Sequence, residues 1–113
     1  MAVIWETVDR LGRSVTISDD AWRHILDGHD EVRRGRLLMS PADVRLAVER
    51  ADEVRRDRFF TRRAIHYRRT EFGELRYRVV VNYRPSKRSG WVGEVITAFL
   101  TARKYQDEVQ LWP

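Results

Sequence analysis

The stretch Gly90-Trp91-Val92-Gly93-Glu94-Val95-Ile96-Thr97-Ala98-Phe99-Leu100-Thr101-Ala102-Arg103-Lys104 has the composition of a central β-strand that ends in a basic turn. β-Branched and aromatic residues, which suit a pleated and half-buried surface, fill its middle. Thr97 is polar where a core strand is ordinarily apolar, and strict alternation places its side chain on the same side as Val95 and Phe99. The Thr97 hydroxyl can belong to an ordinary sheet residue, or it can bond a phosphate oxygen.

Two preceding segments alternate in the way that half-buried strands do. In residues 75–83 the odd positions are apolar or aromatic, whereas Arg76 and Arg78 lie on the other side. Residues 62–69 place Tyr67 on one side and both His66 and Arg68 on the other. Shorter strands are expected at residues 3–8, 14–17 and 109–112, and residues 52–56 can form an edge strand.

Helix signals are confined to the first half of the chain. Ser18 is a typical N-cap for a helix over residues 19–28, and the pair Ser40-Pro41 begins another helix. Residues 31–39 can form a further short helix or a loop. Helices that precede a run of antiparallel strands predict an α+β fold, with N-terminal helices packed on one face of an antiparallel β-sheet of four to five strands.

The length and charge of the chain limit its class. Its 113 residues suit a single domain over residues 1–113, and a hydrophobic content of 42% excludes a disordered chain. Twenty of the 22 basic residues are arginine and the net charge is +5, which favours polyanionic partners. The same composition also suits a plain soluble surface that is rich in arginine.

Several classes of site and location are disfavoured. The chain has no cysteine, which excludes disulfides, thiolate nucleophiles and cysteine-based zinc sites. No apolar run approaches the roughly 20 residues of a membrane helix. No signal peptide is visible at the N-terminus, so a cytoplasmic protein without a membrane partner is expected.

The histidines are the first candidates for chemistry, because their protons exchange near neutral pH. His29 falls on the apolar side of the first predicted helix, where it can be a catalytic group or a core histidine bonded to a carbonyl. His24 lies five residues earlier and points elsewhere, a spacing that is poor for one metal ion. No metal site is therefore predicted. At the end of the strand that opened this section, Arg103 and Lys104 can hold a phosphate or form a surface turn.

Several of these segments occur in an order that resembles a known family. The segment from Ile17 to Val32 resembles the "His-Ile-x-x-x-His-Pro-Glu" opening of phage-associated nucleases of the barnase–EndoU–colicin–RelE superfamily. Asp30 departs from this pattern by standing where proline is usual. Four later segments resemble that group's helix start, its "Tyr-Tyr-Lys/Arg" strand, its "Val-Ile-Thr-Ala-Tyr" strand and its terminal "Leu-Trp": they are Ser40 to Val44, Ile65 to Arg68, Val95 to Phe99 and Leu111-Trp112.

The resemblance implies a metal-independent endoribonuclease, toxin-like or phage-related, that needs no cofactor. Attack by the RNA 2′-hydroxyl on the adjacent phosphate would leave a 2′,3′-cyclic phosphate and a free 5′-hydroxyl. His29 would be the general base or acid, Arg68 and Arg103 would neutralise the phosphate, and Thr97 and Tyr67 would orient phosphate or ribose. Four further residues are expected to contact the RNA: His24, His66, Arg78 and Lys104.

The expected partners are an RNA, such as a tRNA or an mRNA, and a cognate antitoxin or immunity protein. Two other functions fit the same sequence. A non-catalytic RNA-binding module would use the same arginines, and its affinity would fall steeply with salt. A phage structural or assembly protein would show no salt-dependent RNA binding at all.

Overall fold

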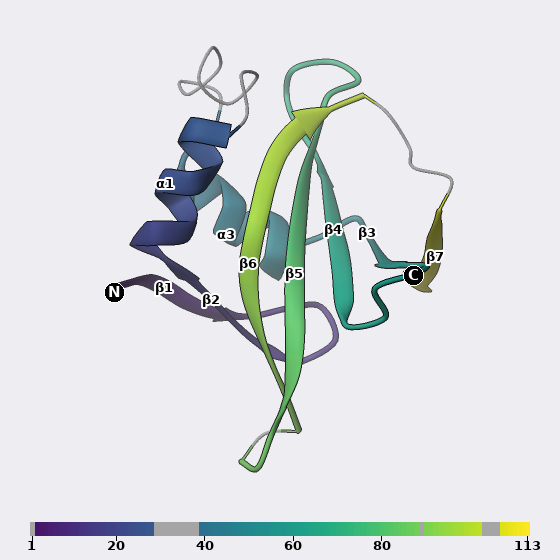
Figure 1. Cartoon of the computed structure of the whole chain (residues 1–113). Coiled ribbons are helices and arrows are strands. Elements are labelled where there is room, and N and C mark those ends of the chain that lie inside the picture. Colours follow the sequence, from purple (N-terminus) through teal and green to yellow (C-terminus); the bar gives the residue numbers. More distant parts are fainter. Residues whose placement is uncertain (1, 29–38, 89, 103–106) are drawn as a thin grey trace.

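The computed structural model describes residues 2–28, 39–88, 90–102 and 107–113 (Figure 1). All seven strands of this part of the chain belong to one sheet, in the order β1-β2-β6-β5-β4-β3-β7. The elements are β1 (Val3–Val8), β2 (Ser14–Ser18), α1 (Asp19–Gly28), α3 (Pro41–Glu49), β3 (Glu53–Asp57), β4 (Arg63–Arg69), β5 (Arg76–Ser86), β6 (Gly90–Thr101) and β7 (Glu108–Trp112).

The predicted α+β fold with four to five antiparallel strands is wrong. The sheet is larger and mixed, because β2 pairs with β6 in parallel while the other neighbours are antiparallel. The hairpin of β1 and β2 joins the sheet beside β6 and does not stand apart at its entrance. Strand β3 lies inside the sheet between β4 and β7. The described residues are therefore mostly sheet, with two short helices (Figure 1).

The two helices begin where the sequence predicts. Ser18 Oγ accepts a hydrogen bond from the Ala21 amide at 3.1 Å, which caps α1. Ser40 and Asp43 form a reciprocal capping box at the start of α3, and Pro41 occupies the first turn. Residues 31–38 and His29 lie outside the described residues.

One large apolar cluster lies between the helices and the sheet. Ile25 of α1 and Val44 and Val48 of α3 are fully buried in it, together with Val79 and Val81 of β5. A second, smaller cluster of Ile65, Tyr67, Val80 and Ile96 contains no residue of α1 or α3. We call the side of β4, β5 and β6 that carries this smaller cluster the second face.

A β-bulge in β6 changes which residues point to the second face. The register moves between Val80 and Val81, so that Val81 pairs with Val95 but Val80 pairs with Thr97. Val95 therefore joins the large core, whereas Thr97 pairs with Val80 on the second face. The predicted common side for Val95 and Thr97 is wrong, because the extra residue of a bulge interrupts alternation.

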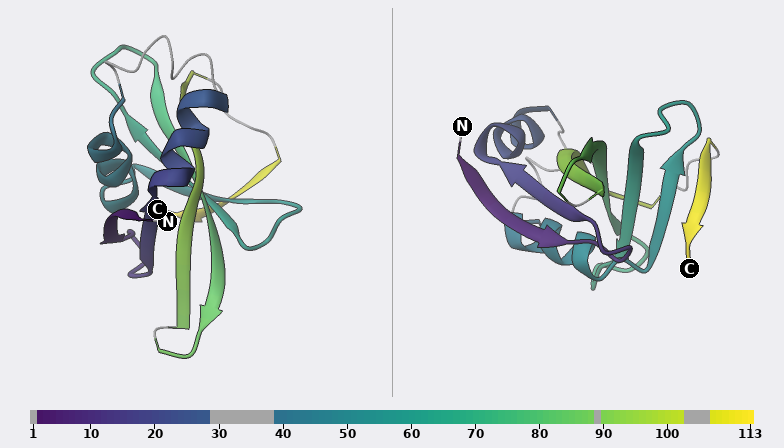
Figure 2. Two further views of the ribbon diagram at one scale, coloured as in Figure 1. Left: turned by 60° about the vertical axis from the view of Figure 1, so that its left-hand side comes forward. Right: turned by 90° about the horizontal axis from the view of Figure 1, so that it is seen from below.

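The sheet is strongly curled. In a flat sheet β7 would lie three strand spacings from β5, which is roughly 14 Å. Instead, Glu108 of β7 contacts Arg78 of β5, with 3.4 Å between Oε2 and Nη2. The views in Figure 2 show β3 and β7 turned away from the plane of β5 and β6. The curl brings a side chain from the last strand over the second face.

Candidate functional site

The second face is rich in arginine. The positions of β4 and β5 that point to it hold five arginines and no carboxylate: Arg63, Arg69, Arg76, Arg78 and Arg84. Arg69 and Arg84 are exposed, whereas Arg78 is only 12% exposed. Since guanidinium groups match phosphate geometry, this side of the sheet is the part of the fold best suited to a polyanion.

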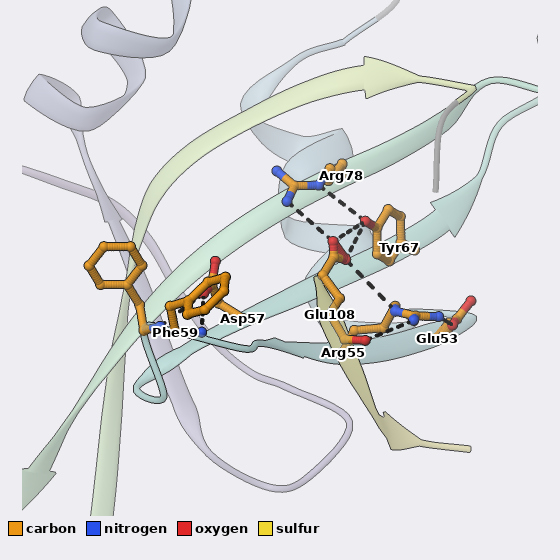
Figure 3. A network of polar contacts seen from close by, with 8 residues as sticks. Glu53, Arg55, Asp57, Phe59, Tyr67, Arg78 and Glu108 are labelled. Carbon is orange, nitrogen blue, oxygen red and sulfur yellow. Dashed lines mark hydrogen bonds and ion pairs between the residues drawn. The ribbon is translucent and has the colours of Figure 1, made fainter. Parts of the chain in front are cut away.

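Glu108 organises the buried part of the second face (Figure 3). The Tyr67 hydroxyl donates to its two carboxylate oxygens at 2.5 and 3.0 Å. Arg78 Nε donates to the Tyr67 oxygen at 3.1 Å, and Arg55 Nη2 donates to the backbone carbonyl of Glu108 at 3.1 Å. Arg55 also forms an ion pair with Glu53 at 2.7 Å. These contacts connect β3, β4, β5 and β7 through one carboxylate.

Tyr67 is held as a neutral hydrogen-bond donor. Burial and then the Glu108 carboxylate raise the pKa of Tyr67 well above its ordinary value of 10.0, although Arg78 opposes the shift. A phenol with a raised pKa keeps its proton at neutral pH. Tyr67 is therefore suited to positioning a neighbouring group and not to acting as a base.

A polar cavity of about 200 Å³ lies beside Tyr67. Its lining combines two carboxylates and two guanidiniums with the tyrosine: Asp52, Glu53, Arg69, Arg76 and Tyr67. Glu53 is 16% exposed and lies 3.7 Å from Arg76 Nη1, whereas Glu108 is only 3% exposed. Asp52 accepts a hydrogen bond from the Arg69 amide at 2.6 Å. A partly exposed carboxylate therefore lies among cations, which is an arrangement suited to acid–base chemistry on a phosphate ester.

Two exposed aromatic side chains stand at the turn between β3 and β4. Phe59 and Phe60 are 72% and 57% exposed. Asp57 Oδ1 accepts hydrogen bonds from both of their amides at 2.8 Å, which holds the turn in shape (Figure 3). Arg63 places its guanidinium 4.2 Å from the centre of the Phe60 ring. Exposed aromatic rings beside cations are suited to stacking unpaired bases.

The structure brings together only part of the predicted site. Tyr67, Arg78 and Thr97 lie on the second face. Arg68 points to the opposite face, where it pairs with Tyr77, so it cannot act beside Tyr67. His24 is exposed on α1 and lines a separate cavity of about 520 Å³ between α1 and strands β1, β2 and β6. His29, Arg103 and Lys104 lie outside the described residues.

His66 is fully buried on the face opposite Tyr67. Its Nε2 lies 3.0 Å from the Tyr83 hydroxyl, which donates to Asp9 Oδ2 at 2.6 Å. Because the only hydroxyl proton of Tyr83 is committed to Asp9, His66 must donate from Nε2. Its Nδ1 has no hydrogen-bond partner among the described residues. A ring buried in this position cannot contact RNA, so the structure gives no support to the predicted RNA contact of His66.

The buried state of His66 should make the fold sensitive to acid. Burial lowers the pKa of His66 from 6.5 to about 4, which Asp9 offsets only in part and Arg13 reinforces. Between these two pH values the unfolded chain binds a proton that the folded chain excludes, so stability falls as the pH falls from 6.5 toward 4. The loss should reach about 3 kcal/mol, measured by urea unfolding at a series of pH values.

The control for this prediction is His66→Phe, which keeps an aromatic ring and removes the titrating group. Its free energy of unfolding should change much less with pH over the same interval. Burial by itself raises the pKa of Asp9, but hydrogen bonds from Tyr83 and Arg13 more than offset this and hold it below its ordinary value. Asp9 therefore weakens the fold only at still lower pH. Equal slopes in the two proteins would show that another group senses the acid.

The sequence did not predict a role for the carboxylates Glu53 and Glu108. Glu53 lies in a charged segment that resembles a solvated edge strand, and Glu108 lies just before a short terminal strand. Glu53, Arg55 and Asp57 are spaced two residues apart in β3. The strand period of two was the only signal that their side chains share a side. Nothing local indicates that Glu108 reaches Tyr67, 41 residues away in the chain.

Two further observations concern the described residues alone. No three of their histidine, aspartate or glutamate side chains are grouped so as to hold a metal ion. Neither of their helices combines the length and the apolar character needed to cross a membrane. Comparison of the chain with protein-family models, with curated proteins and with solved structures found no match.

Proposed function

We propose that this protein is an endoribonuclease that cleaves single-stranded RNA by 2′-hydroxyl transesterification without a metal ion. The observation that carries the proposal is the cavity that Glu53 lines together with Arg69 and Arg76, on a face rich in arginine. The similarity of short segments to phage-associated nucleases of the barnase–EndoU–colicin–RelE superfamily supports the same activity.

In this proposal Glu53 is the general base. It takes the proton of the 2′-hydroxyl, the 2′ oxygen attacks the adjacent phosphorus, and the bond from phosphorus to the 5′ oxygen breaks. Arg69 and Arg76 neutralise the charge that develops on the phosphorane oxygens, which is the role that metal ions fill in other nucleases. His29, predicted as the general base or acid, would then be the acid that protonates the leaving 5′ oxygen.

The buried network supports the geometry of the cavity. Glu108 fixes the Tyr67 ring that forms one of its walls, and Arg55 holds Glu53 by an ion pair. Such supporting contacts matter because catalytic groups must be placed to within a fraction of an ångström. Thr97 lies on the same face but does not line the cavity, so it is a candidate for contacts with a neighbouring nucleotide.

The decisive experiment is an RNA cleavage assay in excess chelator. The purified protein should cleave a single-stranded RNA and leave 2′,3′-cyclic phosphate and 5′-hydroxyl ends. A substrate with 2′-deoxyribose at every position should resist cleavage, because it lacks the attacking hydroxyl. Cleavage that requires a divalent cation, or that also cuts the DNA strand, would refute this mechanism.

RNA binding should depend on salt through the exposed arginines. If Arg69, Arg76 and Arg84 each contact one phosphate, the logarithm of the binding constant should fall against the logarithm of salt concentration with a slope of about −2. Arg84→Gln should reduce the magnitude of this slope by about 0.7, as measured by fluorescence anisotropy with a labelled oligonucleotide.

Arg23→Gln is the matched control, because it removes the same charge from an exposed position on α1. Its slope should equal that of the unaltered protein. Equal effects of the two substitutions would indicate a general charge effect and not a binding face. Salt-dependent binding without any cleavage would instead favour the non-catalytic RNA-binding module.

A further inference from the structure

A third cavity, of about 130 Å³, lies where the first turn of the chain meets the ends of β3, β4, β5, β6 and β7. Four arginines and no carboxylate line it. The full lining is Arg13, Arg56, Thr61, Arg62, Arg63, Ala64, Tyr83, Trp91 and Leu111. Ala64 and Tyr83 belong to the large core cluster, whereas Arg63 belongs to the second face, so the cavity lies at the ends of the strands and not on one face alone.

Two of the four guanidiniums carry buried nitrogens that lack a partner. Arg13 Nη2 and Arg56 Nε are shielded from solvent and have no hydrogen-bond acceptor among the described residues. Buried polar groups are nearly always satisfied in folded proteins, and a buried cationic donor without an acceptor is especially costly. Because solvent does not reach these two atoms, a ligand in the cavity would contact the other nitrogens of the four guanidiniums.

Arg13 is held in place before any ligand arrives. Its Nε donates to Asp9 Oδ2 at 2.9 Å, and its guanidinium carbon lies 3.8 Å from the centre of the Tyr83 ring. Tyr83 donates in turn to the same carboxylate. A cation fixed from two sides loses little conformational freedom on binding, which favours affinity.

The rest of the lining indicates what accompanies the anion. Trp91 and Leu111 are 43% and 42% exposed and form an apolar wall. A phosphate group fits the clustered guanidiniums, since it offers several acceptor oxygens to planar donors. An exposed indole beside a phosphate site is suited to stacking a base.

We infer that this cavity binds the phosphate group of a nucleotide, with Arg13 and Arg56 as donors and Trp91 stacked against the base. The phosphate can come from a free 5′-mononucleotide or from the 5′-phosphorylated end of an RNA strand. This site is separate from the Glu53 cavity and does not depend on the proposed cleavage activity.

The test is isothermal titration calorimetry of the full chain with AMP, with inorganic phosphate and with a short RNA that carries either a 5′-phosphate or a 5′-hydroxyl. AMP should bind, and Arg56→Gln should weaken its binding by about ten- to hundredfold, because one charge-assisted hydrogen bond is lost. Arg23→Gln should leave the affinity within a factor of about two. Tighter binding of AMP than of the phosphorylated RNA would identify the free nucleotide as the source, and the reverse order would identify the strand end.

A second variant tests the base contact. Trp91→Leu should weaken AMP binding and leave the weaker binding of inorganic phosphate unchanged. Thermal unfolding of each variant without ligand shows that it is folded. The inference fails if AMP does not bind at millimolar concentration, if Arg56→Gln binds AMP as the unaltered protein does, or if an acidic peptide binds more tightly than AMP.

Discussion

Glu53→Gln should lower the rate of RNA cleavage by about 10²- to 10⁴-fold, which is the range that a positioned general base contributes. The amide is almost the same size as the carboxylate but cannot take up the proton of the 2′-hydroxyl. Single-turnover cleavage of a labelled oligonucleotide in excess chelator measures the effect. Binding of the RNA should change little, because Arg69 and Arg76 stay in place.

The control must separate chemistry from charge and from folding. Glu74→Gln makes the same change at an exposed position in the turn between β4 and β5, and its cleavage rate should equal that of the unaltered protein. Glu53 is half-buried and pairs with Arg55 and Arg76, so its loss also costs some stability. Assays well below the melting temperature of the variant keep this cost out of the rate. A Glu53→Gln protein that cleaves at the full rate would remove Glu53 from the mechanism.

The alternation of residue types was sufficient to predict which side chains of the central strands share a face. The alternation within β4 places Tyr67 on one side and His66 and Arg68 on the other, and the alternation within β5 separates Arg76 and Arg78 from the apolar positions, as the structure confirms. Side-chain direction in a strand follows from backbone geometry alone, so a run without irregularities can be read directly. The prediction fails at the bulge at Ile96, because one inserted residue reverses the side of Val95 relative to Thr97.

The order of the strands could not be predicted in the same way. The parallel pairing of β2 with β6 joins residues that are far apart in the chain, and no turn between them specifies it. Strand β3 looked like an exposed edge because its sequence is charged, yet β7 pairs along it. A charged strand can be internal when its acids and arginines neutralise one another, as Glu53 and Arg55 do.

The candidate site depends on the curl of the sheet, and this explains why the sequence identified only its centre. Tyr67 and Arg78 were both predicted as site residues, and the pairing of β4 with β5 makes them neighbours. Glu108 reaches Tyr67 across one intervening strand and Arg78 across two, which no local rule anticipates. Burial of His66 likewise depends on what packs over it and not on its own segment. Of the cations at this site, the sequence therefore predicted only Arg78, and tertiary packing selected Arg69, Arg76 and the carboxylates.

Glu108→Ala should lower the free energy of unfolding by about 3–5 kcal/mol, the usual cost of removing one partner from a buried ion pair. The substitution removes the carboxylate that faces Arg78 and Arg55, and it leaves the buried Tyr67 hydroxyl without its acceptor. For a domain of this size the melting temperature should fall by at least about 12 °C. Urea unfolding and calorimetry measure the two quantities.

Asp20→Ala is the matched control, since it breaks the exposed ion pair with Arg23 on α1 and should cost no more than about 1 kcal/mol. Glu108→Gln should lose less stability than Glu108→Ala, because the amide oxygen still accepts from Tyr67. A loss of less than about 1 kcal/mol for Glu108→Ala would show that Arg78 and Tyr67 find compensation elsewhere.

The Glu108 variants also test whether Glu108 only positions the candidate site or takes part in the reaction. Glu108 is almost inaccessible, so its effect on cleavage must act through the position of Tyr67 and the cavity beside it. Glu108→Gln should therefore recover part of the cleavage rate that Glu108→Ala loses, in parallel with its stability. Glu53→Gln should lose far more of the rate than its smaller loss of stability explains. Loss of activity in Glu108→Gln as complete as that in Glu53→Gln, at unchanged stability, would instead make Glu108 the base.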